Sequence, residues 1–288
     1  MGSTTPADLG SLLPIEHDLC RHVRQAEASL SASRPASDTL WDHLLRVARL
    51  AQRLGRDEGL EPGACRLAGL FHDAGKFAGG RLHHDQQPEE ERSVELLRLL
   101  AQEHGTPEQV VEPVAAAILQ LYRSPEQPSP LARVLFDADN LDKLGPLGVA
   151  NFFVKAGLRG DGISRATLFR LTVELTYSHH AAGCMYTASG RDLARRRAAE
   201  TDRFLHGLLK ALKADGLHDF SVRQIRHKDL DIEVVEPRSC TCGHRLSRRI
   251  WDEQGVKCTE IHLQHFCSAC GERHELHFCR PRFAEPCA

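Results

Sequence analysis

Apolar residues recur with the 3.6-residue period of core-facing helices from Leu12 to about Gly216, and glycine or proline separates the segments. The pattern predicts helices over residues 40–54, 64–73, 93–104, 112–122, 131–144, 164–177 and 191–213. Beyond Gly216 the composition becomes strand-like, with Val and Ile clustered in residues 219–236. We therefore expect a mainly α chain, in which a helical domain (residues 12–216) is followed by a linker and small β module (residues 217–288). Residues 1–11 are small and polar and predict a flexible tail.

Composition narrows the class of protein. The chain has 288 residues, of which 41% are hydrophobic and 26% charged, as in soluble globular proteins. It contains no apolar run long enough for a transmembrane helix and no secretory signal pattern at its start, so we expect a cytoplasmic location. The formal net charge of −2 gives no basic field for non-specific binding of nucleic acid.

Polar side chains interrupt the apolar stripes of three predicted helices. His43 lies in the inward stripe of the first helix, and His72 shares the apolar face of the second, with Asp73 directly after it. Asp139 falls in the stripe of the fifth helix, and Asp142 follows one turn later. A carboxylate is costly to bury without a partner. A divalent metal ion is a suitable partner for two histidines and two aspartates that point inward.

Three motifs in order resemble the HD-domain superfamily of metal-dependent phosphohydrolases. They are Trp41-Asp42-His43, then Leu-Phe-His-Asp-Ala-Gly-Lys at residues 70–76, then Phe-Asp-Ala-Asp-Asn-Leu-Asp-Lys-Leu-Gly at residues 136–145. The resemblance covers roughly residues 38–215 and implies a helical bundle that holds one divalent metal ion.

The resemblance assigns roles to individual residues. It implies that His43, His72, Asp73 and Asp139 are the metal ligands, and that Asp73 also belongs to the catalytic group. Lys76 occupies the family position that contacts substrate phosphate. Asp142 is expected to orient a ligand or a water molecule. The other aspartate of the third motif, Asp137, points to another helix face and is expected either to be structural or to support a metal ligand through a hydrogen bond.

The implied activity is hydrolysis of a phosphate ester or anhydride, with nucleotides as the leading substrate class. Mn²⁺ or Mg²⁺ is favoured, and Fe²⁺, Co²⁺ or Ni²⁺ would also suit the mixed nitrogen and oxygen ligands. Such an ion can polarise phosphorus and lower the pKa of a bound water. Lys76, Arg92 and Arg123 would neutralise charge on the phosphoryl group, and His84 is a further candidate for substrate contact.

Two other functions remain open at this point. Two-metal HD proteins, including di-iron oxygenases, need further histidines, but Arg92 and residues 120–122 stand at the corresponding positions and supply no imidazole. His83, His84 and His104 are nearby and could fill that role. The main alternative is a non-catalytic regulatory protein that binds a metal or a nucleotide and recruits a partner through its C-terminal module.

Six of the ten cysteines lie in a 40-residue stretch near the C-terminus. Cys240 and Cys242 form one pair and Cys267 and Cys270 another, and a glycine follows each pair, as in the two knuckles of a zinc ribbon around a β-hairpin. Four thiolates would close the coordination shell of a structural Zn²⁺.

Alternative ligands of the zinc site are His244 or His265 in place of one thiolate, with Cys258 and Cys279 as second choices. From Pro237 onward, 8 basic residues face 6 acidic ones, an excess too small to indicate nucleic acid. Protein docking, dimerisation and substrate gating all remain open as roles of the module. The expected ligand of the helical domain is a phosphorylated small molecule.

Overall fold

The computed structural model describes residues 13–30, 39–77, 88–123, 127–255 and 258–282. The chain forms two compact units. Unit 1 comprises Met1–Asp142 and Tyr186–Gly190, and unit 2 comprises Lys143–Met185 and Arg191–Ala288. The predicted tail, residues 1–11, lies outside the described residues.

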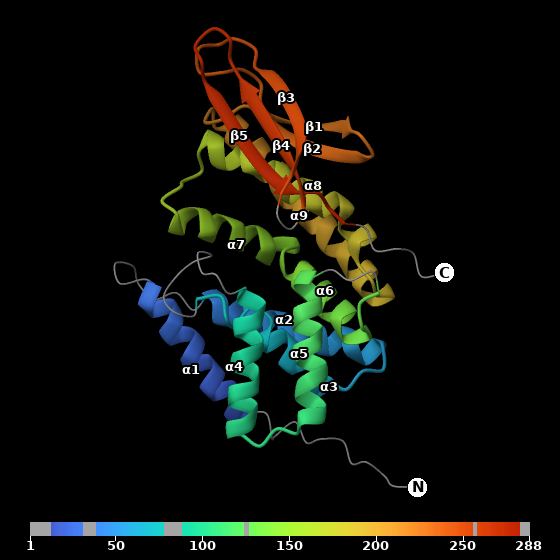
Figure 1. Ribbon diagram of the computed structural model, residues 1–288. Coiled ribbons are helices and arrows are strands. Elements are labelled where there is room, and N and C mark those ends of the chain that lie inside the picture. Colours follow the sequence, from blue (N-terminus) through green and yellow to red (C-terminus); the bar gives the residue numbers. More distant parts are fainter. Residues whose placement is uncertain (1–12, 31–38, 78–87, 124–126, 256–257, 283–288) are drawn as a thin grey trace. The chain divides into compact units, whose positions relative to one another are not determined.

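Unit 1 is a helical bundle (Figure 1). Its helices are α1 (Leu13–Leu30), α2 (Thr39–Asp57), α3 (Pro62–Phe71), α4 (Glu89–Glu103), α5 (Glu108–Arg123) and α6 (Pro130–Asp142). Local signals explain the start of α3, where Pro62 occupies the first turn and the Glu61 carboxylate accepts hydrogen bonds from the amides of Gly63 and Ala64. The predicted helices of this region are confirmed, with ends that differ by a few residues.

Helices α2 and α3 touch through their backbones at Gly69. A Cβ atom at this position would lie 2.4 Å from the Cα of Ala48 and 2.6 Å from its nitrogen, so only glycine fits. The fully buried side chains of Leu44, Val47 and Leu70 belong to the surrounding core. This close approach brings His43 of α2 next to His72 at the end of α3.

Unit 2 combines three helices with five strands. The helices are α7 (Gly145–Leu158), α8 (Arg165–Cys184) and α9 (Ala188–Ala214), whose first three residues belong to unit 1. The sequence pattern does not predict helix α7, because the pair Gly145-Pro146 is typical of the end of a helix. Proline is compatible with the first turn of a helix, and Pro146 occupies that position in α7.

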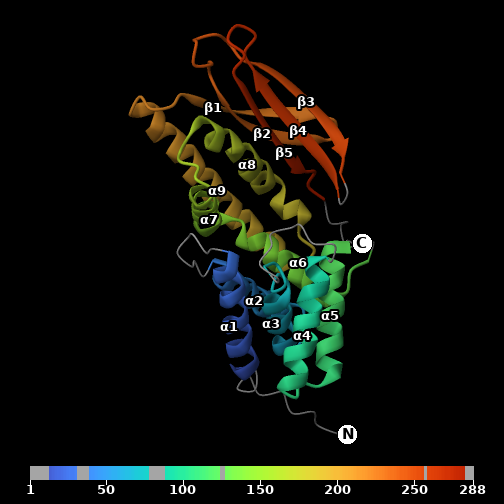
Figure 2. The same ribbon diagram turned by 60° about the vertical axis from the view of Figure 1, so that its left-hand side comes forward.

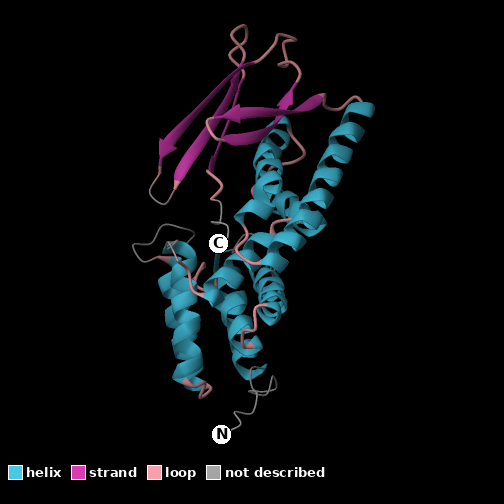
Figure 3. Cartoon of the chain, turned by 90° about the vertical axis from the view of Figure 1, so that its right-hand side faces the viewer, coloured by secondary structure: helices cyan, strands magenta, loops and turns pink. Residues whose placement is uncertain are grey.

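The strands form two antiparallel sheets, which the secondary-structure colouring of Figure 3 separates from the helices. Strands β1 (Phe220–His227) and β2 (Leu230–Pro237) form a hairpin. The second sheet has the order β3 (Ser247–Gln254), β4 (Thr259–Phe266) and β5 (Arg273–Cys279). A mainly α chain that ends in a small β module is therefore confirmed.

Helix α8 packs against the strands (Figure 2). Phe169 of α8 shares a core with Ile232 of β2, Leu263 of β4 and Phe278 of β5. The hydroxyl oxygens of Thr172 and Thr176 accept hydrogen bonds from backbone amides of β2, at 3.0 and 3.1 Å. The predicted domain boundary between residues 216 and 217 lies where the helices end and the strands begin. That the parts on either side of it are separate domains stays a prediction. None of the described helices combines the length and apolar character that crossing a bilayer requires.

Candidate functional site

Four predicted ligands converge inside unit 1. The Nε2 atoms of His43 and His72 are 3.2 Å apart. An Asp73 carboxylate oxygen lies 3.8 Å from each of these nitrogens. An Asp139 oxygen, from α6, lies 3.6 Å from His43 Nε2 and 3.7 Å from His72 Nε2. Residues from α2, the turn after α3 and α6 therefore meet at one point, as the motif order predicts.

The outer nitrogens of both imidazoles are held in place. His72 Nδ1 donates to the backbone carbonyl of Gly69 at 2.8 Å, an oxygen that can only accept. His43 Nδ1 lies 2.8 Å from the Asp142 carboxylate. Arg46 donates two hydrogen bonds to the same carboxylate, at 2.7 and 3.0 Å. Burial works to raise the pKa of Asp142, but the bonds from His43 and Arg46 together outweigh it and hold this pKa below its ordinary value. Asp142 is thus an ionised acceptor for the His43 Nδ1 proton.

The donor set fits a divalent metal ion. Because both Nδ1 atoms carry the proton in the neutral rings, both Nε2 atoms present lone pairs, and they face two carboxylate oxygens. Four acceptor atoms at such separations repel one another unless a cation lies among them. Ligand atoms about 2.0–2.2 Å from a shared ion are about 3–3.5 Å apart, close to the separations found here.

Charge within the site agrees with this interpretation. Burial disfavours a charged His72, but the carboxylates of Asp73 and Asp139 outweigh it and raise the pKa of this imidazole. Burial likewise opposes the charge of Lys76, yet the nearby Asp73 carboxylate raises its pKa, and the ammonium lies 2.9 Å from Asp73. The site thus attracts positive charge, and its one lysine stays protonated.

The residues predicted to contact substrate, and the further histidines considered with them, lie outside the cluster of four ligands or outside the described residues. Arg92 lies in the first turns of α4, and its Cβ would be 2.7 Å from a Cβ added to Gly75, so this helix adjoins the ligand turn. Arg123 ends α5, and its side chain lies outside the described part of the chain. His83 and His84 also lie outside it. His104 binds Asp18 of α1 at 2.9 Å instead of joining the ligands.

Asp137 does not join the ligand cluster that contains Asp139 but binds the backbone of another segment of unit 1. Its fully buried carboxylate accepts hydrogen bonds from the amides of Tyr186 and Thr187, both at 2.8 Å, and from the Thr187 hydroxyl at 2.7 Å. The carboxylate therefore holds the segment Tyr186–Gly190 against α6, which agrees with the structural one of the two roles expected for it.

A second donor cluster consists of the four predicted zinc ligands. The Sγ atoms of Cys240, Cys242, Cys267 and Cys270 all lie within 4.8 Å of one another. Tetrahedral Zn²⁺ with bonds of about 2.3 Å places its sulfurs about 3.8 Å apart. The distances Cys240–Cys267, Cys240–Cys270 and Cys242–Cys267, 3.3, 3.9 and 3.6 Å, are near this value, whereas Cys240 and Cys242 lie closer, at 2.6 Å. The four thiols therefore suit a zinc ion.

Backbone turns shape both knuckles. Gly243 and Gly271 have φ angles of +86° and +78°, which glycine adopts without strain. The backbone amides of Cys270 and Ala269 stabilise the Cys267 thiolate and lower the pKa of this thiol to about 6. Strands β3 and β4 form the predicted hairpin between the two knuckles.

The alternative zinc ligands have other environments. His244 Nδ1 lies 3.3 Å from Cys242 Sγ, whereas His265 is buried and faces Glu236 at 3.3 Å. The second-choice assignment of Cys258 and Cys279 is wrong, because these residues form a disulfide. The register pairs Cys279 with Glu260, near the start of β4, whereas the Cys267 knuckle follows the end of that strand.

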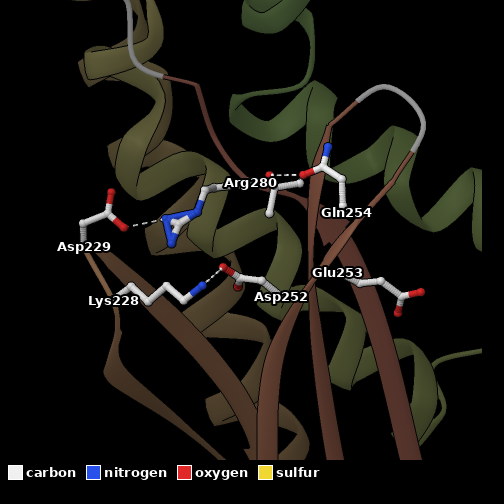
Figure 4. A pocket seen from close by; sticks show the side chains of 7 residues that line it. Lys228, Asp229, Asp252, Glu253, Gln254 and Arg280 are labelled. Atoms are coloured by element: carbon white, nitrogen blue, oxygen red, sulfur yellow. Dashed lines mark hydrogen bonds and ion pairs between the residues drawn. The ribbon is translucent and has the colours of Figure 1, made fainter.

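An open hollow of about 500 Å³ lies among the strands of unit 2 (Figure 4). Its lining includes Lys228, Asp229, Asp252, Glu253, Gln254 and Arg280. Both cations are bound by acids: Lys228 lies 2.6 Å from Asp252, and Arg280 lies 2.7 Å from Asp229. Both cations of the hollow are therefore paired, and its lining contains none of the predicted ligands.

Arg46 contacts the site but is not among the residues predicted from the sequence. An arginine three residues after His43 resembles an ordinary exposed helix residue, and its partner Asp142 is 96 positions away. The one available signal is its spacing of i+3 from a histidine on the inward stripe.

Comparison with solved structures shows what the chain is similar to. An HD-superfamily hydrolase from Bacillus thuringiensis is 19% identical with a TM-score of 0.50, covering 69% of this chain and 99% of that one. The Lin1889 protein from Listeria innocua is 20% identical with a TM-score of 0.51, covering 71% and 96%. YpgQ from Bacillus subtilis, solved in complex with ADP, is 25% identical with a TM-score of 0.48, covering 68% and 96%.

No curated protein matches the chain. The family model of the HD domain matches residues 40–144, a range that contains His43, His72, Asp73, Asp139 and Asp142. The Bacillus thuringiensis structure shares the fold. The family match assigns residues 40–144 of this chain to the HD domain.

Proposed function

We propose that the chain is a metal-dependent phosphohydrolase that cleaves a phosphate ester or anhydride, with nucleotides as its first substrate class. The observation that supports it is the convergence of two imidazole Nε2 atoms and two carboxylates next to a protonated lysine. Such a site suits a divalent cation and, beside it, an anionic substrate. The HD domain at residues 40–144 supports the same class of reaction.

His43, His72, Asp73 and Asp139 would hold one divalent ion, for which Mn²⁺ and Mg²⁺ are the favoured candidates. When bound, such an ion polarises a phosphate oxygen and lowers the pKa of a coordinated water. Lys76 contributes a positive charge near Asp73, where it would neutralise charge on the transferred phosphoryl group.

Asp142 and Arg46 act on the orientation of His43. The Asp142 carboxylate fixes the proton on His43 Nδ1 and thereby keeps the lone pair of Nε2 directed toward the other ligands. Arg46 in turn holds Asp142 through two hydrogen bonds. We assign both residues positioning roles in the proposed site.

In unit 2, we propose that Cys240, Cys242, Cys267 and Cys270 hold one structural Zn²⁺. Support comes from their mutual distances and from the glycine turns of both knuckles. Four thiolates leave no open coordination position for a substrate, so this site would stabilise the β module.

The test combines a substrate panel with single-site variants of the full chain. Nucleoside mono-, di- and triphosphates and p-nitrophenyl phosphate are incubated with Mn²⁺, and released phosphate and pyrophosphate are measured. We expect Asp139→Asn to abolish release, and Lys76→Gln to raise KM for substrate while Mn²⁺ affinity changes little. Asp202→Asn, at a largely exposed side chain on α9, is the matched control and should behave as wild type.

Three outcomes decide the proposal. Release that disappears only in Asp139→Asn supports it, and the product identifies the bond that breaks. Release that persists in that variant shows another source of activity. A wild-type protein that binds Mn²⁺ but releases nothing from any substrate refutes the hydrolase and favours the regulatory binding protein.

A further inference from the structure

The pair His72-Asp73 lies where helix α3 has already ended. Helix α3 ends at Phe71, and His72 is its C-cap. The carbonyl of His72 therefore accepts no hydrogen bond from within the helix. Two turn bonds hold the following backbone, from the Ala74 amide to the Phe71 carbonyl and from the Lys76 amide to the Asp73 carbonyl. These bonds leave the His72 carbonyl and the Gly75 amide to be satisfied from elsewhere.

Ser93 of α4 satisfies both groups with one hydroxyl. Its Oγ accepts a hydrogen bond from the Gly75 amide at 2.9 Å and donates one to the His72 carbonyl at 3.3 Å. Ser93 has 0% exposure, and Gly75 is also buried, so water does not compete for these bonds. The two bonded groups flank Asp73, and one side chain therefore fixes the backbone on both sides of the ligand pair.

Helix α4 also contacts the turn sterically. A Cβ at position 75 would lie 2.6 Å from the Ser93 amide nitrogen and 2.7 Å from the Glu89 carbonyl oxygen. The first turns of α4 are thus in direct contact with the turn backbone, and the hydroxyl bonds set the register of that contact. A residue with any side chain in place of Gly75 would separate the two backbones.

We infer that Ser93 is a positioning residue for metal binding, acting through the backbone of His72 and Gly75. This inference rests on the metal site of the proposed function, but it concerns binding and not turnover. Removal of the hydroxyl leaves a buried amide and a buried carbonyl without their partner, so the ligand pair gains freedom to move. Loss of comparable supporting bonds around metal ligands lowers metal affinity by about 10- to 100-fold.

The experiment measures Mn²⁺ binding to the full, metal-depleted chain from the electron paramagnetic resonance signal of free Mn²⁺. Mn²⁺ prefers oxygen and nitrogen ligands, so the four thiols of unit 2 contribute little to the titration. Ser93→Ala removes the hydroxyl, and Ser93→Cys fills similar space with a weak donor and acceptor. Ser178→Ala is the matched control, because Ser178 is a buried helix serine of unit 2 whose hydroxyl donates to the Ala198 carbonyl at 3.2 Å.

We expect both Ser93 variants to bind Mn²⁺ about 10- to 100-fold more weakly than wild type, with Ser178→Ala unchanged. Wild-type affinity in both Ser93 variants overturns the inference, even if their melting temperatures fall, because Ser93 would then be only a packing residue. If Ser93→Ala fails to fold, Ser93→Cys decides alone. A wild type that binds Mn²⁺ without hydrolysing phosphate refutes the proposed function and leaves the role of Ser93 intact.

Discussion

The contact of Gly69 with Ala48 controls the spacing between two predicted metal ligands, and Gly69→Ala tests this directly. The new methyl group would lie 2.4 Å from the Ala48 Cα and 3.0 Å from the Val47 carbonyl carbon. Non-bonded carbons approach to about 3.5–4.0 Å. The two helices must therefore move apart by about 1 Å at this point.

The size of the effect follows from this displacement. Excess volume in a packed core costs about 1–3 kcal/mol of unfolding free energy. The Nε2 atoms of His43 and His72 are 3.2 Å apart. Metal sites tolerate deviations of about 0.2 Å in their bond lengths. A shift of about 1 Å between the helices that position these ligands should reduce Mn²⁺ affinity by about tenfold or more.

Urea unfolding and Mn²⁺ titration of Gly69→Ala measure the two effects separately. Gly207→Ala is the matched control, since Gly207 lies within α9 and a Cβ there meets no atom within 4 Å. The control should gain about 0.5–1 kcal/mol from the lower entropy of its unfolded chain. A Gly69→Ala protein with wild-type stability and wild-type Mn²⁺ affinity would refute the argument that this contact sets the ligand spacing.

Three further predictions address other parts of the chain. Burial raises the pKa of Glu174 from 4.5 to about 7. The unfolding free energy of the wild type, relative to that of Glu174→Gln, should therefore fall as pH rises from 4.5 to about 7 and then level off. Urea titrations at pH 5 and 8 measure this difference, and Glu103→Gln, at an exposed residue, is the control. Asp137→Ala should lower the unfolding free energy by about 3 kcal/mol, because it leaves buried donors unpaired; an unchanged urea midpoint would contradict this. Among the described cysteines, Cys258 and Cys279 form the one disulfide, so thiol labelling of the denatured, unreduced, metal-free protein followed by peptide mapping should leave these two residues unlabelled; labelling of both would exclude the bond.

The convergence of His43, His72, Asp73 and Asp139 could be predicted from the sequence, because charged side chains are conspicuous within an apolar helical stripe. Their role as metal ligands stays a prediction. His43 and Asp139 interrupt such stripes, and the motif order supplied their connection to His72 and Asp73. Five of the helices described in unit 1 were predictable for the same reason, since each has a strong period and a glycine or proline near its end. Helix α1 (Leu13–Leu30) was not predicted as a separate element, although the predicted helical domain begins at residue 12.

What the sequence did not reveal depends on contacts between distant positions. Arg46 and Ser93 resemble ordinary helix residues until α6 and the turn after α3 are placed beside them. The disulfide depends on the register of β4 and β5, which brings Cys258 and Cys279 together across 21 positions. Helix α7 was missed because a Gly-Pro pair marks the start of a helix as well as an end.

The return of the chain at Tyr186–Gly190 has a consequence for the order of folding during synthesis. The buried carboxylate of Asp137 needs amides that are translated about fifty residues later. Unit 1 therefore cannot complete its hydrogen bonding when Asp142 leaves the ribosome, and all of α7 and α8 must emerge before the segment Tyr186–Gly190 is available. A fragment that ends at Asp142 would expose an unsatisfied carboxylate, whereas one that extends through Gly190 contains every segment of unit 1.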